Sequence, residues 1–227
     1  MKYNERIQNP EDSLIFMRSL TFIGGFLNAY SYYTRGGAFV SFHTGNFVRI
    51  GLSILERNSI KFWSSFIPIM AAFLGAIISS FLKYKITTES NLYFKRIILI
   101  EIIVFFIIGF IKSDSLNNVI NFILSMIAMF QLTSFRRIKN ISHNTTIMTG
   151  NIRTLAQLFS NWMIEKKNKK NLVEFISYFI TFISFLVGVI AGGVISLTYN
   201  KFAIWLCVFI LAVLFLNLNK KEKMRLN

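Results

Sequence analysis

Six apolar segments, each long enough to cross a lipid bilayer, dominate this 227-residue sequence. A transmembrane helix needs about 20 consecutive, mainly apolar residues. Hydrophobic residues make up 54% of the chain and charged residues only 15%, so the composition is not that of a typical soluble domain. The sequence therefore predicts an all-α membrane protein with six transmembrane helices, at about 14–33, 62–82, 94–112, 117–134, 172–198 and 202–218.

The positive charges between these segments predict how the chain crosses the membrane. With a cytoplasmic N-terminus, 18 Lys and Arg residues fall on the inner side and 6, among them Arg35, on the outer side, leaving aside Arg18 within the first segment. Because Lys and Arg are enriched in cytoplasmic loops, both termini are expected in the cytoplasm. The basic loops suit anionic lipid headgroups as partners. They form no single basic face, so the net charge of +15 does not indicate nucleic-acid binding.

The tripeptide Thr-Gly-Asn occurs twice and marks equivalent points in two halves of the chain. Each copy lies between the first and second apolar segments of its half and opens a short helical stretch, 46–55 and 151–163. Three spans per half is an odd number, so the second half must enter the membrane from the opposite side. We therefore predict two inverted transmembrane repeats, 14–112 and 117–218, between cytoplasmic tails at 1–13 and 219–227.

Both short helices are expected to be half-helices that begin inside the membrane. At about 1.5 Å per residue they are too short to cross a bilayer, and the preceding residues 34–43 and 137–148 are long enough to re-enter it. Thr favours a helix N-cap, Gly lets a solute approach the backbone, and Asn both donates and accepts hydrogen bonds. The alternative is that the tripeptides only cap helices at the membrane surface. The predicted solute-binding residues are Thr44, Gly45, Asn46, Thr149, Gly150 and Asn151.

Polar residues inside the spans extend this candidate site. Asn28 and Gln131 precede the two tripeptides and are predicted to face a shared cavity, or alternatively to form interhelical hydrogen bonds. A surrounding set is expected to comprise His43, Arg49, Arg153 and Glu101. For the two arginines the alternative is snorkelling to the interface, and for Glu101 it is a contact at the cytoplasmic interface, a local pair or a coupling-ion role.

The sequence contains no pattern for a cofactor, a metal or a soluble-type catalytic site. His43 and His143 are the only histidines, and Cys207 is the only cysteine, so neither a metal-ligand cluster nor a disulfide is expected. An intramembrane enzyme would depend on one of the two histidines. A non-transporting scaffold would act through the basic loop 166–170.

The residues around the first tripeptide resemble a known family. The run from Gly24 to Ala29, the run from Gly37 to Asn46 and the second Thr-Gly-Asn are similar to the YoaK-like family of bacterial multi-pass inner-membrane proteins, whose function is unknown. The resemblance covers nearly the whole chain and implies a six-span plasma-membrane protein. Members of the family often carry an acidic residue at the position of Asn28, so a proton-handling carboxylate is missing there.

The leading hypothesis is a transporter or channel whose solute binds between two half-helix N-termini at the bilayer midplane. The positive ends of helix dipoles, together with the expected lack of a central acidic residue, favour a small anion or a polar neutral molecule. Gly188 and Gly192 form a G-x-x-x-G face, which predicts packing within the chain or a homodimer.

Overall fold

The computed structural model describes residues 14–85, 91–134, 137–138, 141–142, 148–165 and 169–226. The described part is almost entirely helical, as predicted. Its α-helices are α1 (Leu14–Thr34), α2 (His43–Leu55), α3 (Ser59–Lys85), α4 (Asn91–Phe110), α5 (Asn117–Ser134), α6 (Met148–Ile164), α7 (Lys169–Tyr199) and α8 (Trp205–Leu226). Two 3-10 helices, η2 (Asp114–Leu116) and η3 (Asn200–Ile204), and a hairpin of β1 (Arg137–Ile138) and β2 (Ile141–Ser142) connect them.

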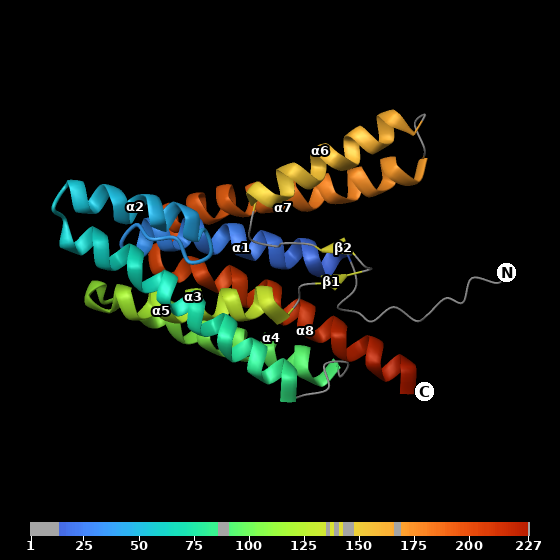
Figure 1. Cartoon of the computed structure of the whole chain (residues 1–227). Coiled ribbons are helices and arrows are strands. Elements are labelled where there is room, and N and C mark those ends of the chain that lie inside the picture. Colours follow the sequence, from blue (N-terminus) through green and yellow to red (C-terminus); the bar gives the residue numbers. More distant parts are fainter. Residues whose placement is uncertain are drawn as a thin grey trace.

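The long helices pack in pairs that join the two halves of the chain (Figure 1). Helix α1 lies against α7, α3 against α5, and α4 against α8. The two shorter helices pack on the helix that follows them, α2 on α3 and α6 on α7. If α1, α2, α3 and α4 are exchanged with α5, α6, α7 and α8 in that order, this set of contacts is unchanged.

The two shorter helices begin near the middle of the bundle and run to opposite ends (Figure 1). Helix α2 runs toward the end where α1 finishes, and α6 runs toward the end where α1 begins. Their 13 and 17 residues correspond to about 20 and 25 Å, which is less than the about 30 Å of a bilayer core. The start of α1 and the end of α8 lie at the same end of the molecule.

Polar side chains face inward and large apolar side chains face outward along much of the bundle. Helix α2 is the clearest case, because its buried residues are Asn46 and Ser53 while Phe47 and Val48 are exposed. Exposed apolar surface of this extent is unfavourable in water and favourable in lipid. The interior also holds an apolar core between α1, α4, α5 and α8, in which Cys207 is fully buried.

Two stretches of the described residues are long and apolar enough to cross a membrane by length and hydropathy. Ser59–Leu82 contains an 18-residue window with a mean hydropathy of 2.0, and Asn171–Leu218 contains one with a mean hydropathy of 2.4. The second stretch has 48 residues and contains all of η3 and most of α7 and α8. The described fold is thus consistent with an all-α membrane protein.

Close helix packing occupies the predicted G-x-x-x-G face within the chain. A Cβ atom at Gly192 would lie 2.6 Å from the carbonyl oxygen of Phe26, so α1 and α7 approach at backbone distance. Gly188 makes a similar approach to α1. Of the two expectations for this face, intramolecular packing is the one seen, and the homodimer stays a prediction.

The predicted N-cap of the first short helix is wrong. Helix α2 begins at His43, its N-cap is Phe42, and no side chain of the cap residue bonds to the helix. Thr44 is exposed in the first turn. A residue of another helix holds the start of α2 in place, because the Oδ1 atom of Asn28 on α1 accepts the backbone N–H of Phe42 at 3.2 Å.

Candidate functional site

The segment between α1 and α2 turns back beside α1, and the side chain of Asn28 holds it there. Two glycines with positive φ, Gly36 at 85° and Gly37 at 79°, reverse the chain. Asn28 Oδ1 accepts the N–H groups of Ser41 at 3.0 Å and Phe42 at 3.2 Å. Its Nδ2 donates to Ser41 Oγ at 2.7 Å and to a carbonyl of its own helix, that of Gly24, at 2.9 Å. This amide therefore acts as a clamp on the segment 35–42.

Asn46 of the tripeptide holds the same segment from the other side. Its Nδ2 donates to the carbonyl of Phe39 at 2.6 Å, and its Oδ1 accepts the N–H of Phe39 at 3.0 Å. Asn46 is fully buried. Both asparagines of the first half thus bind the segment 35–42 with their side-chain amides.

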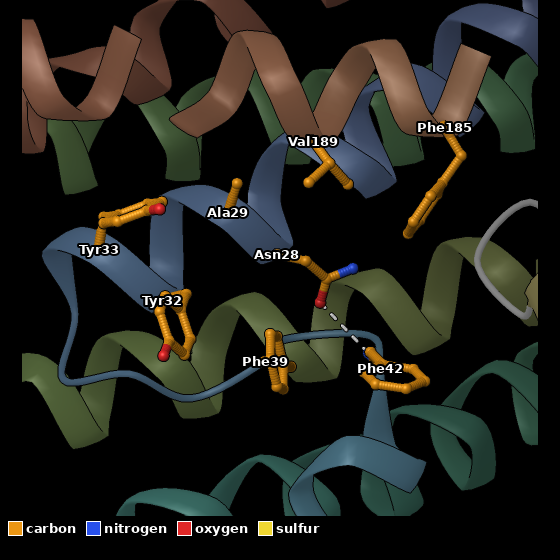
Figure 2. A pocket seen from close by; sticks show the side chains of 8 residues that line it. All are labelled: Asn28, Ala29, Tyr32, Tyr33, Phe39, Phe42, Phe185 and Val189. Carbon is orange, nitrogen blue, oxygen red and sulfur yellow. Dashed lines mark hydrogen bonds between the residues drawn. The ribbon is translucent and has the colours of Figure 1, made fainter. Parts of the chain in front are cut away.

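A cavity of about 500 Å³ lies between α1, this segment and α7 (Figure 2). Aromatic rings form most of its wall. Tyr32 stacks on Phe39 with ring centroids 5.5 Å apart, and Phe39 meets Phe42 edge-on at 5.4 Å. None of the lining side chains is charged. The lining residues are Asn28, Ala29, Tyr32, Tyr33, Phe39, Phe42, Phe185 and Val189.

Gly45 supports the aromatic wall from behind. A Cβ atom at this position would lie 2.5 Å from the ring of Phe42 and 3.1 Å from that of Phe39. Any side chain at Gly45 would therefore displace both rings. Of the first tripeptide, Gly45 and Asn46 shape the cavity indirectly, and Thr44 is exposed on α2.

Arg49 and His43 occupy different positions around α2. Arg49 Nε donates to Ser65 Oγ on α3 at 3.1 Å, and its guanidinium lies beside Gly37, where a Cβ would be 3.2 Å from Nη2. Arg49 therefore ties α2 to α3 and to the chain reversal. Both ring nitrogens of His43 are buried and have no hydrogen-bond partner in the described part of the chain.

The second tripeptide lies at the start of α6. Thr149, Gly150 and Asn151 belong to its first turn, but their side chains lie outside the described residues, as do His143 and residues 166–168 of the basic loop. Arg153, further along α6, is exposed. The binding role predicted for this tripeptide stays a prediction.

Gln131 on α5 is engaged with Glu101 on α4. Gln131 Nε2 donates to Glu101 Oε2 at 3.1 Å, and both residues are buried. Asn28 and Gln131 thus make separate sets of hydrogen bonds. The expectation that the bundle lacks a central acidic residue is wrong, because Glu101 is 1% exposed, midway along α4. Position along the chain could not reveal this, since burial depends on the partner helix.

Arg35 is a buried residue that sequence reasoning placed in an outer loop. Its side chain is fully buried, and its guanidinium donates to the carbonyls of Ile108 at 3.0 Å and Ile111 at 2.9 Å. It also donates to the hydroxyl of Tyr30, from Nη2 at 2.8 Å. The backbone carbonyl of Arg35 accepts Asn121 Nδ2 at 2.7 Å. Arg35 therefore links α1 to the C-terminal carbonyls of α4, where a cation is favourable, and to α5.

Comparison with known proteins places the chain among membrane proteins. A family described as "Protein of unknown function (DUF1275)" matches residues 16–217. The chain belongs to this family. It is 21% identical over 207 residues to a protein of Bacillus subtilis (strain 168) named "UPF0700 transmembrane protein YoaK", covering 88% of this chain and 90% of that protein. No solved structure matches the chain.

Family membership confirms the predicted resemblance and brings no activity with it. In the described part of the chain, no three His, Cys, Asp or Glu side chains are grouped so that they could hold a metal ion. Thr44 is exposed, and the nitrogens of His43 are buried without a partner. No base and nucleophile are therefore in contact at this position, as covalent catalysis would require.

Proposed function

We propose that the protein is a transporter or channel of the bacterial plasma membrane, which carries a small solute past the cavity beside α2. Both termini lie in the cytoplasm, and six helices cross the membrane: α1, α3, α4, α5, α7 and α8. The excess of Lys and Arg in the corresponding loops supports this orientation. Helix α1 begins and helix α8 ends at the same end of the bundle (Figure 1). This agrees with an even number of membrane crossings.

The observation that carries the proposal is the arrangement of α2 and α6. Each begins near the middle of the bundle, and they run to opposite ends (Figure 1). Irregular backbone at membrane depth is tolerated where it is buried in protein or lines a cavity. The segment before α2 meets this condition, because Asn28 and Asn46 bind its backbone and a cavity lies beside it. Broken helices of this kind form solute sites in inverted-repeat transporters.

The pairing of helices supports an inverted repeat. The contacts of α1 with α7, α3 with α5 and α4 with α8 are preserved when the two halves exchange places. A two-fold axis in the membrane plane produces this kind of pattern, because it exchanges repeats of opposite orientation. Under this relation α6 is the counterpart of α2, and its tripeptide is the counterpart of Gly45 and its neighbours.

The solute class follows from the cavity lining. No lining side chain is charged, and the cavity wall is almost entirely apolar. The nearby N-terminus of α2 presents backbone N–H groups and the positive end of a helix dipole, which disfavours a cation. Of the two classes predicted from the sequence, a small polar neutral molecule suits this lining better than an anion.

A thermal-stability screen of the purified protein tests this proposal. A solute that binds only the folded state raises its stability, by about 2.7 kcal/mol at 100 times its dissociation constant. Polar neutral solutes, small anions and small cations are compared on wild type, Gly45→Ala and Gly51→Ala. Gly51 is the matched control, because it lies on α2 with open space around it.

We expect a neutral solute to raise the melting temperature of wild type and Gly51→Ala but not of Gly45→Ala, in which the rings of Phe42 and Phe39 are displaced from their places in the cavity wall. A stabilising solute that acts equally on Gly45→Ala would contradict binding at this cavity. Absence of stabilisation by every class, up to the solubility limit of each solute, would contradict a solute site altogether.

A further inference from the structure

Glu101 carries one oxygen atom that has no partner inside the bundle. Its Oε2 accepts the hydrogen bond from Gln131 at 3.1 Å. Its Oε1 is buried and has no hydrogen-bond partner in the described part of the chain. Buried polar atoms are usually satisfied, so this oxygen needs an explanation.

A cavity of about 260 Å³ adjoins Glu101 between α3, α4 and α5. Every other lining residue is apolar. Two of them, Ile78 and Ile100, are 43% and 55% exposed, so the cavity reaches the outer apolar surface of the bundle. The lining residues are Ile78, Leu82, Ile97, Ile100, Glu101, Met126, Ile127 and Phe130.

No described cation neutralises this carboxyl group. On α8 the titratable group that interacts with Glu101 is the thiol of Cys207, which is buried and carries no positive charge. On η3, Lys201 is bound to Asp114 instead. Of the basic residues of α4 itself, Arg96 is exposed and Lys95 is partly exposed, and neither makes an ion pair with Glu101. Helices α3 and α5 contribute only uncharged side chains to the cavity wall. An ionised carboxylate without a counter-charge is very unfavourable in such surroundings.

We propose that Glu101 is a proton-binding carboxyl group, oriented by Gln131 and buried beside the apolar cavity between α3, α4 and α5, which apolar reagents can enter from the outer surface of the bundle. Oε2 accepts from Gln131, so the proton is on Oε1, the oxygen without another partner. This site is separate from the cavity beside α2, and the proposal holds whether or not the protein transports a solute.

A protonated carboxyl group in an apolar cavity reacts with an apolar carbodiimide. The O–H proton moves to one carbodiimide nitrogen, and the carboxyl oxygen forms a bond to the central carbon, which gives an O-acylisourea. Transfer of the acyl group from oxygen to nitrogen then yields a stable N-acylurea. No atom leaves, so the peptide gains the full mass of the reagent, and no oxidant or reductant is needed.

Labelling of the full chain in liposomes with dicyclohexylcarbodiimide, followed by peptide mass spectrometry, tests the proposal. We expect modification at Glu101 at neutral pH, with a rate that falls as the pH is raised, and no comparable modification at exposed Glu56. A water-soluble carbodiimide should show the reverse preference. Glu101→Gln should remove the label from this peptide.

Two variants test the route through the cavity without removing the carboxyl group. Leu82→Phe narrows the cavity and is expected to slow labelling several-fold. Leu99→Phe is the matched control, because Leu99 is exposed on α4 and does not line the cavity, and it should leave the rate unchanged. An unmodified Glu101 in folded wild-type protein, a rate independent of pH, or equal rates at Glu101 and Glu56 would each overturn the proposal.

Discussion

A Cβ atom at Gly188 on α7 would lie 2.1 Å from the carbonyl oxygen of Phe22 on α1. The same relationship occurs on the other side of the bundle, where a Cβ at Gly75 on α3 would lie 2.3 Å from the carbonyl oxygen of Met126 on α5. Both contacts join the second long helix of one half to the first long helix of the other half. Close packing of small residues is a main source of helix association in membranes, so these two contacts are expected to hold the halves together.

Gly188→Ala should destabilise the protein, because the new methyl group meets a backbone atom that cannot move independently of its helix. Overpacking of this kind costs about 1–3 kcal/mol. Gly193→Ala is the control on the same helix, since its Cβ would meet only the ring of Tyr33, at 3.4 Å. Thermal unfolding in detergent should show a lower melting temperature for Gly188→Ala alone. Equal melting temperatures for the two variants would refute the close contact.

Asn28→Leu should loosen the segment 35–42 without removing any charge. The substitution leaves the N–H groups of Ser41 and Phe42 without their acceptor, and an unsatisfied buried donor costs about 1–3 kcal/mol. Asn28→Asp retains an acceptor for both groups and should be milder. Hydrogen exchange at these two amides should therefore be fastest in Asn28→Leu. Thr44→Val, at an exposed position, should leave it unchanged, and unaltered exchange in Asn28→Leu would exclude the clamp.

Arg35→Met should be among the most destabilising single changes in the bundle. It removes hydrogen bonds from a charged donor to Tyr30, Ile108 and Ile111, each contributing about 1.5–3 kcal/mol. Arg35→Lys should destabilise the protein less than Arg35→Met, but the variant should still be less stable than wild type. An ammonium group keeps the charge and lacks the planar set of donors of a guanidinium group. The exposed Arg96→Ala on α4 serves as control. If Arg35→Met and Arg96→Ala have the same melting temperature, Arg35 contributes nothing to the stability of the protein.

Acid should weaken the contact between η2 and η3. The hydrogen bond from Lys201 Nζ to Asp114 Oδ1, at 2.6 Å, and a second one from Asn117 hold the pKa of Asp114 below its usual 3.8. Because the folded-state pKa is the lower one, the stabilisation is present above the unfolded-state pKa and is lost as the pH falls through the folded-state pKa. Asp114 is well exposed, so the effect is small.

The measurement for this contact is the melting temperature of wild type and Asp114→Asn as the pH is lowered from neutral to below 3.8. The difference between the two proteins should shrink across the acidic end of this range. A constant difference at every pH would mean that the carboxylate of Asp114 does not take part.

The helices were predictable from sequence because long apolar runs have few alternatives in a membrane protein. The runs that predict spans at 62–82 and 172–198 correspond to α3 and α7. The earlier start of α3, at Ser59, reflects a local cap, since Asn58 Oδ1 accepts the N–H of Lys61 at 3.0 Å. Single-residue signals of this kind shift a boundary without altering the apolar run.

The roles of individual polar residues were much less predictable. Asn46 was expected to meet a solute, but its amide is bound to Phe39, which only the path of the segment before α2 explains. Arg35 follows the last turn of α1 and is predicted to lie with the outer-side charges, yet it is fully buried and bound to carbonyl groups at the end of α4. Glu101 was expected to reach the cytoplasmic interface or to pair locally, and its partner lies 30 positions away in sequence. Each outcome depends on contacts between distant helices, which hydropathy does not encode.

Solute flux through proteoliposomes tests the proposed transport function most directly. Light scattering reports the swelling of vesicles in isosmotic gradients of small neutral solutes and of small anions, with empty vesicles for reference. We predict that wild type and Gly51→Ala accelerate swelling with at least one polar neutral solute, and that Gly45→Ala, inserted to the same level, reduces the rate at least ten-fold. Swelling no faster than in empty vesicles for every solute, or equal rates in Gly45→Ala and Gly51→Ala, would contradict transport past the cavity beside α2.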